Sequence, residues 1–496
     1  MKYSLIPVFF LLMYFHSESL KASTNLDYKT ADELTYRLFK EKDWDSVIDI
    51  GKQALRANID FYYLRVRMGL SYYERKNYIP AASHLCKARQ FDPSDPVIAN
   101  YLYYAYLFTN RLEEARMLQA SLPANSRNVA DPEKGVVDRI TFESGYTFSS
   151  NNAMKDKPSL MGNDSIYGET DVYGDYLYEH LGLKINLSKR VGLSFGYSYL
   201  NFSKTKYIQY ARIEDQLQSI ADSSWGKYYR YAYPCVTYDT SFRYHISQHE
   251  IHANLSWYLN GGFRVIPAFH MIHVSYPVVS ASAKVQTVND TGSYLSIGHQ
   301  YVTFPFDRTM YTYSHSDTSF SNYLVSLNMS KEIGRFNVGI SGSWSNLNNM
   351  EQKQVGAALT WLPFGNLNLY GTTSVMGFFE GKTKRLLLSQ VLGVKITPWC
   401  WAEGSFYYGD YTDANIMNGT VVYNNSDVID YRGSANLYFL AGKHFQFSLI
   451  YQYARKESKQ YYFTTDPSTN EVSSTPGILY IPYHIQTIIG GVTWKL

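Results

Sequence analysis

The C-terminal part of the chain, from residue 139 to Leu496, alternates between apolar and polar positions. Between Phe336 and Trp344, every second position holds an apolar residue or glycine, and Asn, Gly or Ser stands between them. The segments Phe445–Tyr453 and Leu181–Leu187 have the same period of two. Because successive side chains of a strand point to opposite faces, each segment predicts a β-strand with one apolar and one polar face.

The polar faces favour a membrane barrel over a soluble sandwich. They are rich in Gly, Ser, Asn, Thr and Gln, which suits a water-filled lumen better than a protein core. The predicted turns fall into a short set, such as 189–190 and 442–443, and a long polar set, such as 204–241, 277–319 and 416–427. Short periplasmic turns with long external loops are typical of outer-membrane barrels.

We therefore expect an antiparallel transmembrane β-barrel over residues 138–496, with about 14 strands and 12 or 16 as alternatives. The strand count depends on residues 293–304, which form either another spanning strand or a hairpin above the membrane. The last strand alternates to Leu496 and resembles the C-terminal signal of outer-membrane barrels, with Leu496 in place of the usual aromatic residue.

A longer period, of about 34 residues, runs through positions 28–122 and is typical of a helical repeat. Trp44, Tyr78 and Leu112 align at this spacing, which predicts helix pairs. The pattern resembles the tetratricopeptide repeat, in which each repeat is a pair of helices. The resemblance implies a fold class of α + membrane β: a tetratricopeptide domain of three repeats over residues 24–122, a linker at 123–137, and then the barrel.

The resemblance also implies a concave face built from the first helix of each repeat. Its positions are apolar or aromatic: Tyr36, Phe39, Leu70, Tyr73, Tyr104 and Leu107. Such a face serves as a groove for a segment of a partner protein, or a flanking helix of the same chain fills it.

The N-terminal segment, positions 1–22, predicts a secretory signal peptide. Lys2 precedes the apolar stretch Leu5–Phe15, which is too short to span a bilayer, and small residues follow. The alternative is an N-terminal anchor helix. With a signal peptide, we expect the barrel in the outer membrane and the repeats in the periplasm.

Composition narrows the classes of function. A net charge of +3 argues against a nucleic-acid binder. Cys86, Cys235 and Cys400 fall in different predicted regions, so we expect no disulfide. The sequence has none of the motifs typical of α/β-hydrolases, zinc proteases, P-loop proteins or dinucleotide-binding folds, so we expect neither an enzyme nor a cofactor.

Charged and histidine side chains are expected at lumen-facing positions. If Leu259 pairs with Phe263 across a turn, His252 faces His270, with Glu250 on the same wall. Two histidines and a carboxylate suit a metal or proton site, but lumen residues usually hydrogen-bond or line a channel, so we assign no metal. The set expected to face the lumen comprises Glu143, Lys184, Glu250, His252, Arg264, His270, Lys395, Glu403 and Arg432. Such charges set the field of a pore or close it by pairing across the lumen.

Tyrosine is abundant, with 48 residues, and clusters in the segment 204–241. There it forms an interfacial girdle, or it stacks on sugar rings of a glycan. Signal peptide, repeats and barrel together resemble the outer-membrane exporters of exopolysaccharide and the YaiO-type barrels, and the tyrosine content is similar to that of Bacteroidota outer-membrane proteins. Polysaccharide exporters generally have many more than three repeats.

The resemblance implies a channel or export protein whose repeats recruit a partner or cargo. The alternative is a membrane-anchored scaffold with a plugged barrel, whose repeats dock a secretion or assembly complex. The expected partners are the outer-membrane bilayer with its lipopolysaccharide, a periplasmic or outer-membrane protein, and a glycan or other polymer as cargo, but no nucleic acid.

Overall fold

The structure is a computed structural model of the chain. It describes residues 26–109, 111–122, 136–153, 165–220, 227–259, 262–297, 300–416, 419–424, 427–464 and 475–496. The predicted signal peptide and most of the predicted linker lie outside these residues. The described residues form two compact units. The first holds those up to Arg75 and Ala81–Tyr101, and the second holds Lys76–Pro80 and Leu102–Leu496.

Six helices follow one another in three pairs. They are α1 (Tyr28–Lys40), α2 (Trp44–Arg56), α3 (Tyr62–Glu74), α4 (Tyr78–Phe91), α5 (Pro96–Phe108) and α6 (Leu112–Ser121). The first and second helices of the pairs each recur at the predicted spacing, which confirms the helical period. Asp27 and Asp43 cap α1 and α2 by accepting hydrogen bonds from the backbone N–H groups of Thr30 and Ser46. The tetratricopeptide assignment itself stays a prediction.

Small residues let the helices of the first unit approach closely. A Cβ atom added to Gly51 of α2 would lie 2.5 Å from Sδ of Met68 in α3, and one added to Gly69 of α3 would lie 2.7 Å from Cδ2 of Leu85 in α4. Arg67 joins α3 to α1 through an ion pair with Asp32 at 2.7 Å. The unit thus has its own packed core. None of the described helices is long and apolar enough to cross a membrane.

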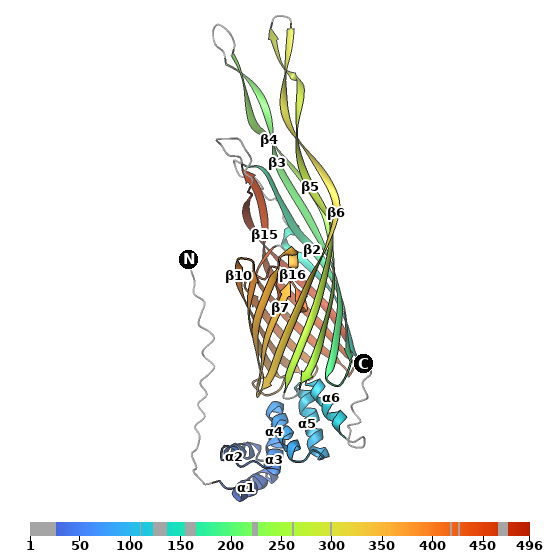
Figure 1. Ribbon diagram of the computed structural model, residues 1–496, viewed down its shortest axis with the longest axis vertical. Helices are drawn as coiled ribbons and strands as arrows, with labels where there is room; N and C mark the ends of the chain where they lie inside the picture. Colours follow the sequence, from blue (N-terminus) through green and yellow to red (C-terminus); the bar gives the residue numbers. More distant parts are fainter. Residues whose placement is uncertain are drawn as a thin grey trace. The chain divides into compact units, whose positions relative to one another are not determined.

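Fourteen strands form a closed antiparallel barrel (Figure 1). The strands are β1 (Val137–Ser149), β2 (Ser165–Asn186), β3 (Val191–Ile220), β4 (Lys227–Leu259), β5 (Phe263–Ile297), β6 (Gln300–Ile333), β7 (Phe336–Ser345), β8 (Gln352–Trp361), β9 (Leu369–Glu380), β10 (Thr383–Thr397), β11 (Cys400–Tyr408), β14 (Val428–Ala441), β15 (Phe445–Thr464) and β16 (Gly477–Lys495). Each strand pairs with the next, and β1 pairs with β16, so the sheet closes on itself. This confirms the predicted architecture and strand number.

Apolar side chains cover the outside of the barrel. On β7, Phe336, Val338 and Ile340 are 43%, 41% and 57% exposed, whereas the intervening Asn337 and Ser341 face the interior. The other strands of the wall repeat this pattern. A continuous apolar band of this extent is stable against acyl chains rather than water. The outer face therefore has the character of a transmembrane barrel.

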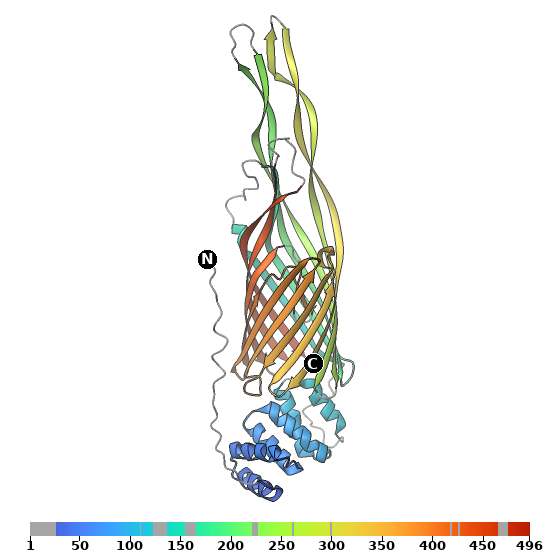
Figure 2. The same ribbon diagram turned by 60° about the vertical axis from the view of Figure 1, so that its left-hand side comes forward.

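The two ends of the barrel differ. At one end, tight turns join successive strands, and glycines with positive φ such as Gly334 (59°) and Gly442 (65°) supply their left-handed positions. At the other end, β3–β4 and β5–β6 continue as two long two-stranded ribbons (Figure 2). The prediction of loops at 204–241 and 277–319 is therefore wrong, because their Tyr-, Val- and Thr-rich sequences favour strand pairing. The described residues of the stretch 293–304, which are 293–297 and 300–304, belong to the β5–β6 ribbon and add no spanning strand.

The structure describes the side chains of two of the three cysteines. Cys86 is in α4 and Cys400 begins β11, so the two lie in different elements as predicted. The side chain of Cys235 lies outside the described part of the chain.

Candidate functional site

The barrel encloses a chamber of about 950 Å³. Serine, asparagine, threonine and glycine positions of β6 to β11 form much of its wall, with tyrosines from β2, β9, β11 and β14. The predicted lumen-facing residues found in this wall are Glu143, Glu250, His252, Arg264, Glu403 and Arg432. The polar faces identified from the alternation thus surround one internal space.

The other three predicted residues lie outside the lining of this chamber. His270 is only 1% exposed. Nζ of Lys184 is 4.0 Å from a carboxylate oxygen of Asp138. Nζ of Lys395 lies 4.9 Å from the centre of the Trp401 ring. The two lysines therefore contact Asp138 and Trp401 instead of the chamber.

The predicted register between β4 and β5 is confirmed. Leu259 pairs with Phe263, and His252 pairs with His270. The ring centres of His252 and His270 are 5.7 Å apart, and those of His180 and His252 are 5.6 Å apart with nearly parallel planes. Gly196 makes room for this row, because a Cβ atom there would lie 2.1 Å from Cε1 of His252.

The histidines of this row have partners in the wall. Among the residues that the structure describes, no three His, Cys, Asp or Glu side chains are grouped so that they could hold a metal ion. Glu250 instead lies 3.2 Å from Nε2 of His270, and Nδ1 of His180 lies 2.9 Å from the hydroxyl of Ser198. The histidines thus contribute hydrogen bonds and ring faces to the wall.

Between β11 and β14, the described residues 409–416, 419–424 and 427 fold back into the lumen, and we name them the inward hairpin. Gly409, with φ of 117°, starts the turn. Within the segment, β12 (Asn415–Ile416) pairs with β13 (Val421–Val422). Residues of both short strands form part of the chamber wall. The prediction of an external loop at 416–427 is therefore wrong.

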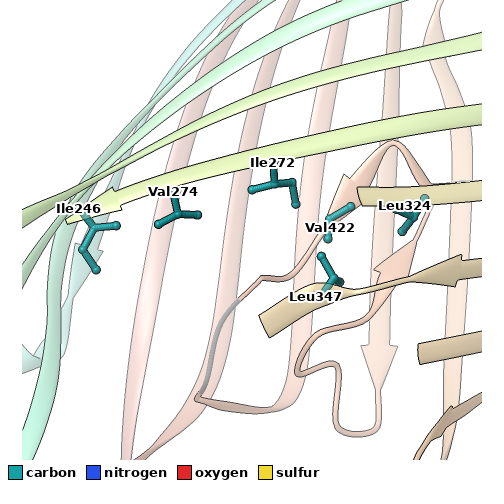
Figure 3. Packing of buried hydrophobic residues seen from close by; sticks show 6 residues of the cluster. All are labelled: Ile246, Ile272, Val274, Leu324, Leu347 and Val422. Atoms are coloured by element: carbon teal, nitrogen blue, oxygen red, sulfur yellow. The ribbon is translucent and has the colours of Figure 1, made fainter. Parts of the chain in front are cut away.

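One apolar cluster holds β13 against the wall (Figure 3). Val422 of the hairpin packs with inward-facing side chains of β4, β5 and β6 and with Leu347 of the β7–β8 connection. The members are Ile246, Ile272, Val274, Leu324, Leu347 and Val422, each at most 9% exposed. Lumen positions of a barrel are normally polar, so these apolar positions are stable only because the hairpin covers them.

A second cluster holds the start of the hairpin against β9 and β10. It contains Phe378, Leu387, Tyr411, Ala414, Ile416 and Ile429. The Tyr411 side chain is 1% exposed, and its hydroxyl donates to the Leu388 carbonyl at 2.8 Å. Full burial of a large apolar side chain is worth about 1.5–3 kcal/mol, so two such clusters make the inward position a defined state.

Polar contacts fix the remainder of the hairpin. Nδ1 of His270 lies 2.8 Å from the carbonyl oxygen of Gly419. The amide of Asn415 donates to the Ser343 hydroxyl at 2.9 Å. Arg385 of β10 forms an ion pair with Asp410 at 2.7 Å. The hairpin is thus attached to β5, β7 and β10.

The sequence contains a signal for this hairpin that lies in the strands rather than in the loop. Phe378 precedes the outward-facing Phe379, and Leu387 stands between the outward-facing Leu386 and Leu388. At these positions both faces of a strand are apolar, so the alternation fails. An apolar residue on the lumen side requires a cover from within the barrel.

The residues of the predicted helical groove are all at least partly exposed. Tyr36 is 49% exposed, and Nζ of Lys40 lies 5.1 Å from the centre of its ring. The Tyr73 ring packs edge-on against Tyr101 at 4.9 Å. The first unit contains Tyr36, Phe39, Leu70 and Tyr73, and the second contains Tyr104 and Leu107.

No family model and no curated protein matches this chain. Among solved structures, the chain is similar to a FadL homologue from Pseudomonas aeruginosa, with 10% identity over 72% of this chain and 90% of that chain and a TM-score of 0.36. It is also similar to the toluene transporter TodX of P. putida, with 7% identity over 74% and 91% and a TM-score of 0.37.

A bacterial polysaccharide outer membrane secretin matches with 6% identity over 73% of this chain and all of that chain, at a TM-score of 0.32. These likenesses are too remote to assign a function to this chain. We therefore infer its function from the barrel, its chamber and the inward hairpin.

Proposed function

We propose that the chain is an outer-membrane channel for polar solutes, narrowed by the inward hairpin, with periplasmic helical repeats that recruit a partner or cargo. The observation that carries the proposal is a polar chamber of about 950 Å³ inside a barrel with an apolar outer face. Such a lumen gives hydrated solutes a path through lipid. The hairpin caps this path, so its displacement controls passage.

The test is the conductance of the purified chain in planar bilayers, compared with a variant that lacks the hairpin. The backbone allows a clean deletion, because the Tyr411 N–H donates to the Ile429 carbonyl at 3.3 Å. Residues 412–427 can therefore be replaced by a two-residue Asn-Gly turn that joins β11 to β14 directly. We expect a small or intermittent conductance for the native chain and a larger, steady one for the variant.

A folded deletion variant without any conductance would exclude the channel. A difference in gel migration between unheated and heated samples checks that the barrel of the variant is closed. Replacing the β9–β10 turn at Gly381–Lys382 by Asn-Gly is the matched control, because this turn lies at the same end and leaves the hairpin contacts in place.

The second candidate is a membrane-anchored scaffold whose barrel stays plugged, and the two buried clusters under the hairpin favour it. In this case the helical repeats alone carry the activity by docking a secretion or assembly complex. Pull-down from solubilised membranes with Tyr36→Ala tests this candidate, with Phe91→Ala as the control because Phe91 is 53% exposed at the end of α4. An unchanged set of captured proteins counts against the groove.

Export of a polysaccharide is the most specific form of the proposal. A polymer is longer than the chamber, so export requires the hairpin to leave the lumen. Cells that carry the deletion variant should then secrete polymer without the displacement of the hairpin that the native chain requires.

A further inference from the structure

The carboxylates of the chamber already have partners in the wall. Glu403 accepts hydrogen bonds from the Tyr370 hydroxyl at 2.7 Å and from the Asn436 amide at 3.2 Å. Glu250 lies 3.2 Å from His270, and Glu143 accepts from the Tyr178 hydroxyl at 3.4 Å. The negative charges of the lining are therefore engaged on the wall itself.

Among the residues that the structure describes, two cations of the same chamber have no such partner. Arg432 on β14 and Lys456 on β15 both line it. In the part of the chain that the structure describes, neither forms an ion pair within 4.0 Å or a side-chain hydrogen bond. Lys456 is only 8% exposed, and Asp427, which attracts it from a longer distance, already accepts a hydrogen bond from the Tyr483 hydroxyl at 2.6 Å. A buried ammonium without a direct partner is costly, so this arrangement needs a compensating group.

The register brings the two cations to one place. Arg432 pairs with Ala454 on β15, and Lys456 is two residues further along the same strand. Both side chains line the chamber, a single register irregularity between Ile429 and Tyr431 lies between them on β14, and the charge of Arg432 acts on Lys456. A single anion between them is within reach of both.

Aromatic rings orient the guanidinium of Arg432. It lies 5.6 Å from the centre of the Tyr407 ring on β11 and 5.5 Å from that of Tyr423 on the inward hairpin. These rings stabilise the cation without neutralising it. Its hydrogen-bond donors stay available for a planar or tetrahedral oxyanion.

We propose that Arg432 and Lys456 form an anion-binding subsite in the chamber, which takes the carboxylate or phosphate group of a small solute. The proposal rests on the proposed channel and names the class of its substrate. Because Tyr423 belongs to the hairpin and packs on Arg432, an anion that binds there also touches the gate of the channel.

The first experiment measures equilibrium binding to the detergent-purified full chain by calorimetry, with inorganic phosphate and succinate as separate probes. The two probes distinguish a preference for phosphate from one for carboxylate. We expect Arg432→Gln and Lys456→Met each to weaken binding at least about tenfold, as expected for loss of one charge-assisted hydrogen bond. Arg432→Lys retains the charge and should retain part of the affinity.

Lys353→Met is the matched control. Lys353 is exposed and pairs with Glu351 at 3.0 Å, and its loss should leave binding unchanged. Heat-modified migration verifies that each variant barrel is closed, and Lys456→Met keeps the proposal testable if Arg432→Gln does not assemble. Absence of binding to the native chain, or equal binding by all variants, overturns the subsite.

The second experiment measures the reversal potential of the hairpin-deleted channel in a KCl gradient. We expect anion preference that falls in Arg432→Gln and Lys456→Met but not in Lys353→Met. If the channel conducts, but replacing either cation changes neither its ion selectivity nor the binding of phosphate, the subsite is overturned and the channel still stands. Phosphate binding that depends on both cations, without any conductance, supports the subsite and refutes the channel.

Discussion

Substitution of Tyr411 tests whether the inward hairpin is the gate. This side chain is 1% exposed, packs against the rings of Tyr407 and Tyr423, and donates a hydrogen bond to the Leu388 carbonyl. Truncation of a buried aromatic residue to alanine costs about 3–5 kcal/mol. Since about 1.4 kcal/mol changes an equilibrium tenfold, Tyr411→Ala should raise the ratio of displaced to inward hairpin by about two to three and a half orders of magnitude.

Two further variants separate this effect from others. Tyr411→Phe keeps the ring and loses only the hydroxyl bond, about 1 kcal/mol, so the ratio should change by less than about tenfold. Tyr408→Ala removes a tyrosine that is 59% exposed on the outer face and should leave the hairpin in place.

The assay is the fraction of time that single channels spend in their largest conductance state, measured in planar bilayers. This fraction should rise strongly for Tyr411→Ala, slightly for Tyr411→Phe and not for Tyr408→Ala. If Tyr411→Ala forms a closed barrel with native conductance, the hairpin is not the gate and the reasoning from its buried contacts fails.

Three other predictions concern the wall and the helices. Ile340→Arg, on the outer face, should lower the free energy of unfolding from lipid vesicles by about 2–4 kcal/mol, whereas Ser341→Arg, on the lumen face, should be tolerated; equal effects in urea titrations would contradict the assigned faces. Gly393→Ala should lower the urea midpoint of unfolding, because the new Cβ atom would lie 2.0 Å from the Tyr370 ring. Adding Tyr370→Ala to this variant should raise the midpoint again. Burial and the neighbouring Arg65 lower the pKa of His84 to about 4, so the unfolded chain takes up the proton first. The contribution to helical stability is then complete above pH 6.5 and is lost towards pH 4; His84→Gln should flatten this dependence in circular dichroism melts, and an unchanged slope would refute it.

The local periods of the sequence were sufficient to predict the helices and the spanning strands. Alternation at Phe336–Trp344 fixes which face is apolar, and the longer period of the repeats fixes where the helices recur. A short turn after Leu259 also fixes the pairing of His252 with His270, because register in a hairpin follows from its turn. These features depend on neighbours in the chain.

The inward hairpin could not be predicted from its own residues. A polar segment after β11 is equally compatible with an external loop and with a lumen plug. Its position depends on partners far away in the sequence, such as Ile272, Leu324 and Phe378. Their apolar side chains at lumen positions were the only local sign, and the sign becomes clear only once the faces of the strands are known.

The unpaired state of Arg432 was likewise beyond the sequence. The alternation indicates that this side chain faces the lumen, as it does for Glu403. Which charge is neutralised depends on the donors on neighbouring strands, and the sequence does not give their geometry. Tyr370 and Asn436 donate hydrogen bonds to Glu403, whereas the partners of Arg432 within the described part of the chain are aromatic rings.

The two long ribbons have sheet edges, which barrel closure removes elsewhere. Pairing between β4 and β5 ends at Ser247 and Ser275, and pairing between β2 and β3 ends at Tyr167 and Tyr210, so beyond these points the ribbons present backbone donors and acceptors along their sides. Such edges invite association with strands of other molecules. Pro234 in β4, Pro305 in β6 and the register irregularity after Arg212 interrupt them. The ribbons can therefore extend into water while resisting polymerisation along their backbones.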